Sequence, residues 1–243
     1  MADISGLGGN SMFGFPVFGF DLTFVLLVPA LILAMYAQAR VSTTFARYSK
    51  ERTASGLTGG QVARRLLDAN GLRNVEVEVT QGSLTDHYDP RKRILRLSPG
   101  VYEGNSMAAF GVAAHETGHA LQHAGGYLPL GIRNNIFPVA SLGSQAAMPL
   151  FIIGLIFRLG PFMQIGILFF AVSVVFQIVT LPVEFNASGR ALHLLQEQRF
   201  LVGDEISGAK KVLSAAALTY LAAALMAVLQ LVRLLVLRNS RRD

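Results

Sequence analysis

The sequence predicts a mainly α membrane protein with about four transmembrane helices and a small α+β region between the first and second of them. Of the 243 residues, 52% are hydrophobic and only 15% are charged. The mean hydropathy of +0.46 is too high for an ordinary soluble domain. The apolar residues also gather into four blocks, each close to the roughly 20 residues that a helix needs to cross a bilayer.

These four blocks define the expected organisation of the chain. Transmembrane helices are expected at 18–39, 134–157, 158–183 and 212–237. The remaining segments are a leader without an assigned role (1–17), the α+β region (40–133), a helix and loop (184–211) and a basic tail (238–243). Ser141, Ser144 and Gln145 make the first half of the second block polar, so a buried or re-entrant helix is the alternative there.

Basic residues beside the blocks predict the orientation in the membrane. Four of them follow the first block closely: Arg40, Arg47, Lys50 and Arg52. By the positive-inside rule, the amino terminus of this multi-pass protein lies outside the cell membrane and region 40–133 faces the cytoplasm. The tail opposes this arrangement, because a four-helix topology would put four arginines outside: Arg233, Arg238, Arg241 and Arg242.

Charge and cysteine content exclude several classes of function. The net charge of +6 comes from residues that flank the blocks, which indicates topology signals and contact with anionic lipid rather than nucleic-acid binding. The chain has no cysteine, so disulfides, iron–sulfur clusters and thiolate zinc sites are excluded. Any metal site must therefore use histidine and carboxylate ligands.

Local signals predict a helix, strands and a second helix within 40–133. Thr58 and Gln61 have the spacing of a capping box, and Gly71 can end the helix that follows. Alternation over 75–80 and apolar residues at 94–97 indicate two strands, separated by a turn at 86–90. A further helix is expected at 107–123, with Ser106 as its cap. An edge strand beside that helix could hold an extended peptide by main-chain hydrogen bonds.

The run GVAAHETGHALQH contains an H-E-x-x-H pattern formed by His115, Glu116 and His119. Residues i and i+4 share one face of a helix, so the two imidazoles can bind a single ion. Catalytic zinc usually takes three protein ligands and keeps a fourth position for water, whose pKa it lowers to about 7. The pattern predicts a zinc peptidase site with Glu116 as general base; a structural pair of histidines is the alternative.

Two simple choices for the third ligand fail. His123 follows His119 by four residues, but three collinear histidines on a straight helix cannot close around one ion at about 2 Å. His123 is therefore expected to support the site or to lie on the surface. The metzincin class would need a third histidine at the position of Gly125, so it is excluded.

Glu184 is the expected third ligand, because it is the next carboxylate downstream of Glu116. A hairpin of the second and third transmembrane helices would return it to the side that holds His115. On a helix that starts near Pro182, Ser188 shares a face with Glu184, so its hydroxyl could steady a ligand. A helix-capping carboxylate is the alternative role for Glu184.

Four motifs occur in order along the chain: DHYDPRKRILRLSPGVY, GVAAHETGHALQH, EFNASGRAL and GAKKVLSAAALTYLAAAL. Together they resemble the YugP-type membrane zinc metallopeptidases, which are related more distantly to HtpX-like and CAAX prenyl proteases. The resemblance implies one catalytic zinc ion bound by His115, His119 and Glu184, as in the HtpX-like group. Those relatives commonly carry an aspartate four residues after the glutamate, where this chain has Ser188.

The expected activity is gluzincin-like hydrolysis of peptide bonds in membrane-proximal or unfolded proteins. Glu116 would deprotonate the attacking water and later protonate the leaving amine. His87, in the turn before the second predicted strand, and Tyr220, in the fourth transmembrane helix, are candidates for contacts to substrate or to the developing oxyanion.

Two other classes of function are less consistent with the sequence than a peptidase. A non-catalytic membrane scaffold with a structural metal would have no use for Glu116 at an open coordination position. A small transporter is disfavoured because the first three transmembrane helices lack interior charges. The expected partners are the lipid bilayer and a protein or peptide substrate, with a membrane-protein partner or a homo-oligomer as further options.

Overall fold

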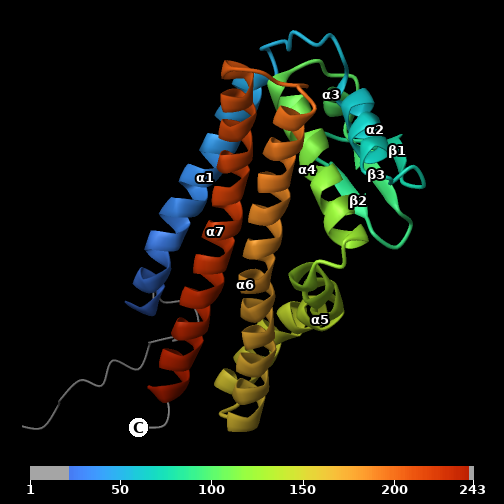
Figure 1. Cartoon of the computed structure of the whole chain (residues 1–243). Coiled ribbons are helices and arrows are strands. Elements are labelled where there is room, and N and C mark those ends of the chain that lie inside the picture. Colours follow the sequence, from blue (N-terminus) through green and yellow to red (C-terminus); the bar gives the residue numbers. More distant parts are fainter. Residues whose placement is uncertain (1–21, 241–243) are drawn as a thin grey trace, which may run out of the picture.

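Three long helices, α1 (Val28–Tyr48), α6 (Gly160–Glu197) and α7 (Asp204–Asn239), lie side by side in the computed structural model (Figure 1). The structure describes residues 22–240, so the predicted leader, the start of the first block and residues 241–243 of the tail lie outside it. A fourth long helix, α5 (Leu128–Ile156), packs along α6. Together with the short 3₁₀ helix η1 (Leu22–Leu27) before α1, these make four segments long and apolar enough to cross a membrane. The predicted mainly α membrane fold is confirmed.

A small α+β region packs against one end of the long helices (Figure 1). It contains α2 (Gly59–Ala69), β1 (Glu76–Val79), β2 (His87–Asp89), β3 (Ile94–Leu97), α3 (Pro99–Tyr102) and α4 (Met107–Ala124). β3 is the central strand, parallel to β1 and antiparallel to β2. Helices α2, α4, α6 and α7 contribute buried side chains to the core of this region, so the core joins it to the long helices.

Polar caps fix the ends of α2 and α4 where the sequence predicts them. Thr58 and Gln61 form a capping box, in which the side chain of each accepts a hydrogen bond from the backbone amide of the other. The Ser106 hydroxyl accepts a hydrogen bond from the Ala109 amide. Gly71, just past α2, has φ of 77°, a conformation that favours glycine.

β2 lies in a segment that the sequence predicts as a turn, and that prediction is wrong for His87–Asp89. Tyr88 pairs with Leu95 of β3, which draws this segment into the sheet. The turn follows directly, because the Asp89 carboxylate accepts hydrogen bonds from the Arg91 and Lys92 amides at 2.9 and 3.1 Å. A strand of three residues is too short for its alternation to stand out among turn-forming residues.

α6 continues through Pro182, which contradicts the prediction of a new helix starting near that residue. A proline inside a helix removes one hydrogen bond and costs about 3 kcal/mol or more. Packing compensates on the following turns, where Val183, Ala187 and Ala191 are fully buried. Glu184 therefore lies inside a long helix, and its alternative role as a helix cap is excluded.

Arg233 contacts η1 rather than ending the fourth transmembrane helix. Its guanidinium lies 3.7 Å from the centroid of the Phe24 ring, and its Nε donates a hydrogen bond to the Thr23 hydroxyl at 3.0 Å. α7 continues past it to Asn239. One of the arginines that opposed the predicted orientation is therefore engaged within the protein.

Small residues allow α4 to approach the long helices closely. A Cβ atom at Gly118 would lie only 2.7 Å from the carbonyl oxygen of Ala187 in α6. At Gly111 a Cβ atom would lie 3.6 Å from the Cβ of Ala209 in α7, an ordinary contact distance. Of these two glycines of α4, Gly118 is therefore the more crowded, and the contact with α6 requires glycine at this position.

We expect Gly118→Ala to lower the stability of the protein by about 1–3 kcal/mol, because the new methyl group would meet backbone that cannot move aside. The measurement is thermal unfolding in detergent, followed by circular dichroism. Gly189→Ala is the matched control, since position 189 of the same helix pair has open space and alanine favours a helix by about 0.5–1 kcal/mol. Equal unfolding temperatures for the two variants would contradict the close contact.

Candidate metal centre

His115 and His119 from α4 meet Glu184 from α6 at the tight contact between these helices. The Oε2 atom of Glu184 lies 3.3 Å from Nε2 of His115 and 3.5 Å from Nε2 of His119. One ligand atom from each residue can be chosen so that all three lie within 4.8 Å of one another. The side chains are 13%, 12% and 4% exposed for His115, His119 and Glu184, so the group is largely buried but still reached by solvent.

The spacing and chemistry of these three groups fit zinc. Ligand atoms at about 2.0–2.2 Å from a tetrahedral zinc ion lie roughly 3.3–3.5 Å from one another, which matches the two distances from Glu184. Two imidazoles and one carboxylate are a donor set found in catalytic zinc sites, with the fourth position left for water. The residues could therefore hold a single ion without a large rearrangement.

His115 has a second contact on its other ring nitrogen. The Ser188 hydroxyl lies 3.1 Å from Nδ1 of His115, one turn along α6 from Glu184. A hydrogen bond there orients the ring and leaves Nε2 directed at Glu184. The Ser188 hydroxyl thus lies beside one of the proposed ligands, as the sequence suggests.

Gln122 provides the matching contact for His119, and the sequence interpretation missed it. Its amide nitrogen donates to the Val183 carbonyl at 2.8 Å and to Asn186 Oδ1 at 3.0 Å, which fixes the orientation of the amide. Its Oε1, 3.0 Å from Nδ1 of His119, can only accept. Nδ1 therefore carries the proton, and the lone pair of Nε2 is free for a metal. The available signal in the sequence was that Gln122 lies three residues after His119.

Arg133 is a second residue that the sequence interpretation missed. It lies in α5, and its Nη1 atom is 3.4 Å from Oε1 of Glu184, the carboxylate oxygen that does not face the histidines. The sequence marks Arg133 only as a boundary of the second transmembrane helix. The available signal for Arg133 was that it is an isolated cation beside a helix without charges. No pattern in the sequence connects it with Glu184.

Glu116 and Tyr220 also lie at the centre. Glu116 is only 8% exposed, and its charge is close enough to act on both His119 and Tyr220. Tyr220, from α7, lies close enough to Glu184 and Glu116 for their charges to act on its hydroxyl. Three helices, α4, α6 and α7, therefore bring polar groups to one place, and α5 adds Arg133.

The metal-free centre favours the protonated form of His119. Burial by itself would lower the pKa of His119, but the hydrogen bond that its ring donates to Glu184 and the charges of Glu116 and Glu184 outweigh that effect. The result is a pKa above the ordinary value for histidine. A metal ion and a proton therefore compete for the same imidazole.

The remaining histidines lie apart from the His115–Glu184 group. His87 in β2 is exposed, and its Nδ1 contacts the Thr85 carbonyl at 2.8 Å. His123, near the end of α4, shares a hydrogen bond of 2.9 Å with the Tyr88 hydroxyl. His193 is 75% exposed and pairs with Glu197 on the same helix.

We expect zinc affinity to fall as the pH is lowered, starting above the ordinary histidine pKa of about 6.5, because His119 must lose its proton to bind the ion. Competition with a calibrated chelator from about pH 8 to pH 5.5 measures this dependence. The dissociation constant should rise by about tenfold per pH unit once His119 is protonated. A constant affinity across this interval would contradict competition at His119.

Comparisons with known proteins agree with this chemistry. Residues 23–239 match the profile of a family described as "Putative neutral zinc metallopeptidase". A Bacillus subtilis (strain 168) protein, "Putative membrane protease YugP", is 47% identical over 218 residues, which cover 90% of this chain and 97% of that protein. No solved structure matches the chain. The extent of both matches shows that the chain belongs to the family of neutral zinc metallopeptidases and is a membrane protease homologue.

Proposed function

We propose that the protein is a zinc-dependent endopeptidase of the membrane, in which His115, His119 and Glu184 bind one zinc ion and Glu116 acts as general base. The observation that carries the proposal is the convergence of Glu184 on two histidines of another helix, 69 positions from His115 along the chain. The zinc metallopeptidase family supports the same metal and reaction class. With two histidines and a distant glutamate, the ligand set is that of a gluzincin.

The reaction divides into roles that named side chains can fill. A bound zinc ion would polarise the scissile carbonyl and lower the pKa of the attacking water. Glu116 takes a proton from that water and passes it to the leaving amine, and its low exposure limits exchange of this proton with bulk water. Tyr220 is the proposed donor to the developing oxyanion, because its hydroxyl lies near both Glu184 and Glu116.

The position of the site along α6 and α7 supports the proposal that its substrates lie at the membrane surface. Phe185, next to Glu184, is 50% exposed, and Leu221, next to Tyr220, is 42% exposed. Beyond this level, toward the α+β region, α6 and α7 carry charged side chains of both signs, among them Arg190, Lys211 and Glu205. Such a change from apolar to charged surface is typical of a bilayer boundary, and the predicted orientation places this side in the cytoplasm. We therefore propose membrane-proximal or unfolded segments as substrates, cleaved on that side.

β2 offers a way to hold an extended peptide. It is an edge strand, with β3 on only one side. The Tyr88–His123 hydrogen bond fixes β2 to the end of α4, one helical turn beyond His119. A peptide paired with the free edge of β2 would be bound through its main chain, which favours unfolded segments over particular side chains.

We expect Glu116→Gln to retain bound zinc and to lose cleavage of an unstructured peptide, because the amide keeps the shape of the side chain but cannot accept the proton. The loss should be at least about 10²-fold, the usual contribution of a general base. Metal analysis and a peptide cleavage assay on purified protein measure the two properties.

Glu184→Ala provides the contrast, because removal of a ligand should abolish stoichiometric zinc binding itself. Retained proteolysis in Glu116→Gln would refute the assigned base. Full zinc content in Glu184→Ala would refute the assigned ligand set. The two outcomes are independent, so each assignment is tested separately.

We expect Arg133→Gln to weaken zinc binding by roughly 10–100-fold, the usual effect of removing a partner that orients a ligand. Arg133→Lys should restore part of the affinity, because a cation remains near Oε1 of Glu184. Arg158→Gln is the matched control, since it removes the same charge just past the other end of α5. Equal affinities in the Arg133→Gln and Arg158→Gln variants would contradict the role of Arg133.

A further inference from the structure

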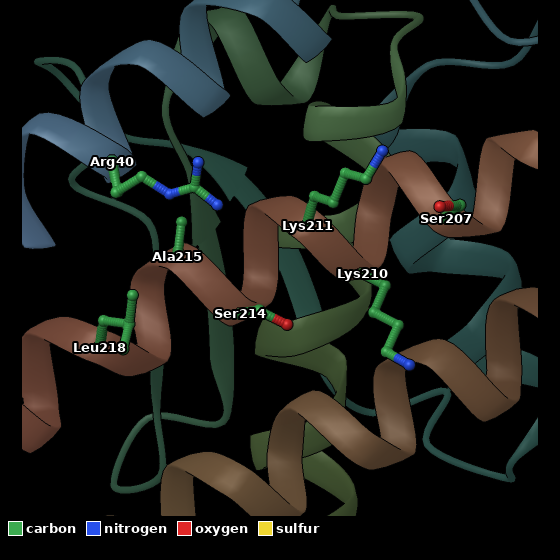
Figure 2. A pocket seen from close by; sticks show the side chains of 7 residues that line it. All are labelled: Arg40, Ser207, Lys210, Lys211, Ser214, Ala215 and Leu218. Carbon is green, nitrogen blue, oxygen red and sulfur yellow. The ribbon is translucent and has the colours of Figure 1, made fainter.

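A pocket of about 280 Å³ lies between α1 and α7, away from the His115–Glu184 group (Figure 2). Its wall carries three cations: Arg40 from α1 and Lys210 and Lys211 from α7. Figure 2 shows Arg40 reaching from α1 toward α7, while Lys210 and Lys211 leave α7 on opposite sides in this view. The volume is close to the lower end of the range for small-molecule sites, about 300–1,000 Å³.

We propose that this pocket binds the phosphate headgroup of an anionic membrane lipid. Within residues 22–240, Arg40, Lys210 and Lys211 form no ion pair. Lys211 lies over the face of the Tyr48 ring, 5.9 Å from its centroid. Three cations gathered in one hollow without a carboxylate create a positive potential that favours an anion. Basic pockets between transmembrane helices are typical sites for anionic lipid headgroups.

Hydroxyl groups lie among these cations on one face of α7. Ser207 and Ser214 line the pocket together with Lys210 and Lys211, at spacings of three, four and seven residues that share a helix face. Serine hydroxyls can donate hydrogen bonds to phosphate oxygens, which a patch of lysines on a solvated surface would not provide. The pocket thus combines charge with hydrogen-bond donors suited to a phosphate.

The lower wall of the pocket is apolar, as a lipid tail requires. Ala215 and Leu218 line it on the side toward the carboxyl end of α7. On α1, Tyr36 lies one turn before Arg40 and is 53% exposed, and Met35 beside it is 66% exposed. The cations therefore lie where the exposed surface changes from apolar to polar, which is the level of lipid headgroups. A soluble phosphate would gain nothing from this apolar continuation.

The opposite face of the same α7 segment packs against α4. A Cβ atom at Gly208 would collide with the Met107 side chain, and Ala209 lies against Gly111. A lipid bound at Lys210 and Lys211 would therefore hold α7 against the helix that carries His115. We expect saturating lipid to raise the unfolding temperature of the protein, because a ligand that binds only the folded state stabilises it.

The test measures binding of short-chain phosphatidylglycerol to the full-length protein in neutral detergent, by native mass spectrometry and thermal shift. Short-chain phosphatidylcholine and inorganic phosphate are the comparison ligands. We expect saturable binding of phosphatidylglycerol with a rise in unfolding temperature, and little effect of the other two. Equal binding of both lipids would overturn the proposal, and equally tight binding of inorganic phosphate would show an anion site that is not specific for lipid.

Charge removal provides the second arm of the test. Lys210→Gln/Lys211→Gln should weaken phosphatidylglycerol binding by roughly 25-fold, about fivefold for each cation near the membrane surface. Lys50→Gln/Arg52→Gln removes the same charge from exposed positions just after α1 and should leave binding unchanged. All four side chains are exposed, so the variants should unfold at the wild-type temperature without lipid. Equal affinities in the two double variants would overturn the proposal.

Discussion

The candidate metal centre depends on how closely α4 approaches α6. Gly118 precedes His119 directly, and Ala187 follows Glu184 by one turn, so a close contact between the two helices adjoins the proposed ligands. Metal–ligand distances tolerate only about 0.2 Å of error, whereas a methyl group at position 118 would force a larger separation. Backbone contact at this point therefore sets the distance between the histidines and the carboxylate. Neither helix could form the three-ligand arrangement by itself.

A polar network supports Glu184 in these largely apolar surroundings. A buried carboxylate is costly unless it is paired and hydrogen-bonded, and here Arg133 lies at one oxygen while the histidines lie at the other. Gln122 joins His119 to α6 through Val183 and Asn186, so the contacts that orient a ligand also fix one helix to the other. Removing one member would leave its partners without hydrogen bonds in a region of low dielectric, which is why such networks act as a unit.

The sequence predicts most of the fold because its strongest signals are local or compositional. Apolar blocks predict the four long helices. Residues whose side chains can form hydrogen bonds with nearby backbone predict the caps at Thr58 and Ser106. The i, i+4 spacing of His115 and His119 needs only helix geometry. Glu184 was predicted by a topological argument, because a hairpin of the second and third transmembrane helices would return it to the side that holds His115. Arg133, β2 and the passage of α6 through Pro182 depend on tertiary packing, which has no local signature.

α7 links the metal centre to the membrane. It brings Tyr220 to Glu184, and ten residues earlier it carries Lys210 and the proposed lipid pocket. Between these two sites α7 is one continuous helix, and Ala209 and Val212 are buried in the protein. A helix transmits a displacement along its axis with little loss, because its hydrogen bonds hold successive turns together. A ligand that holds α7 in place at Lys210 would therefore also help to hold Tyr220 near Glu184.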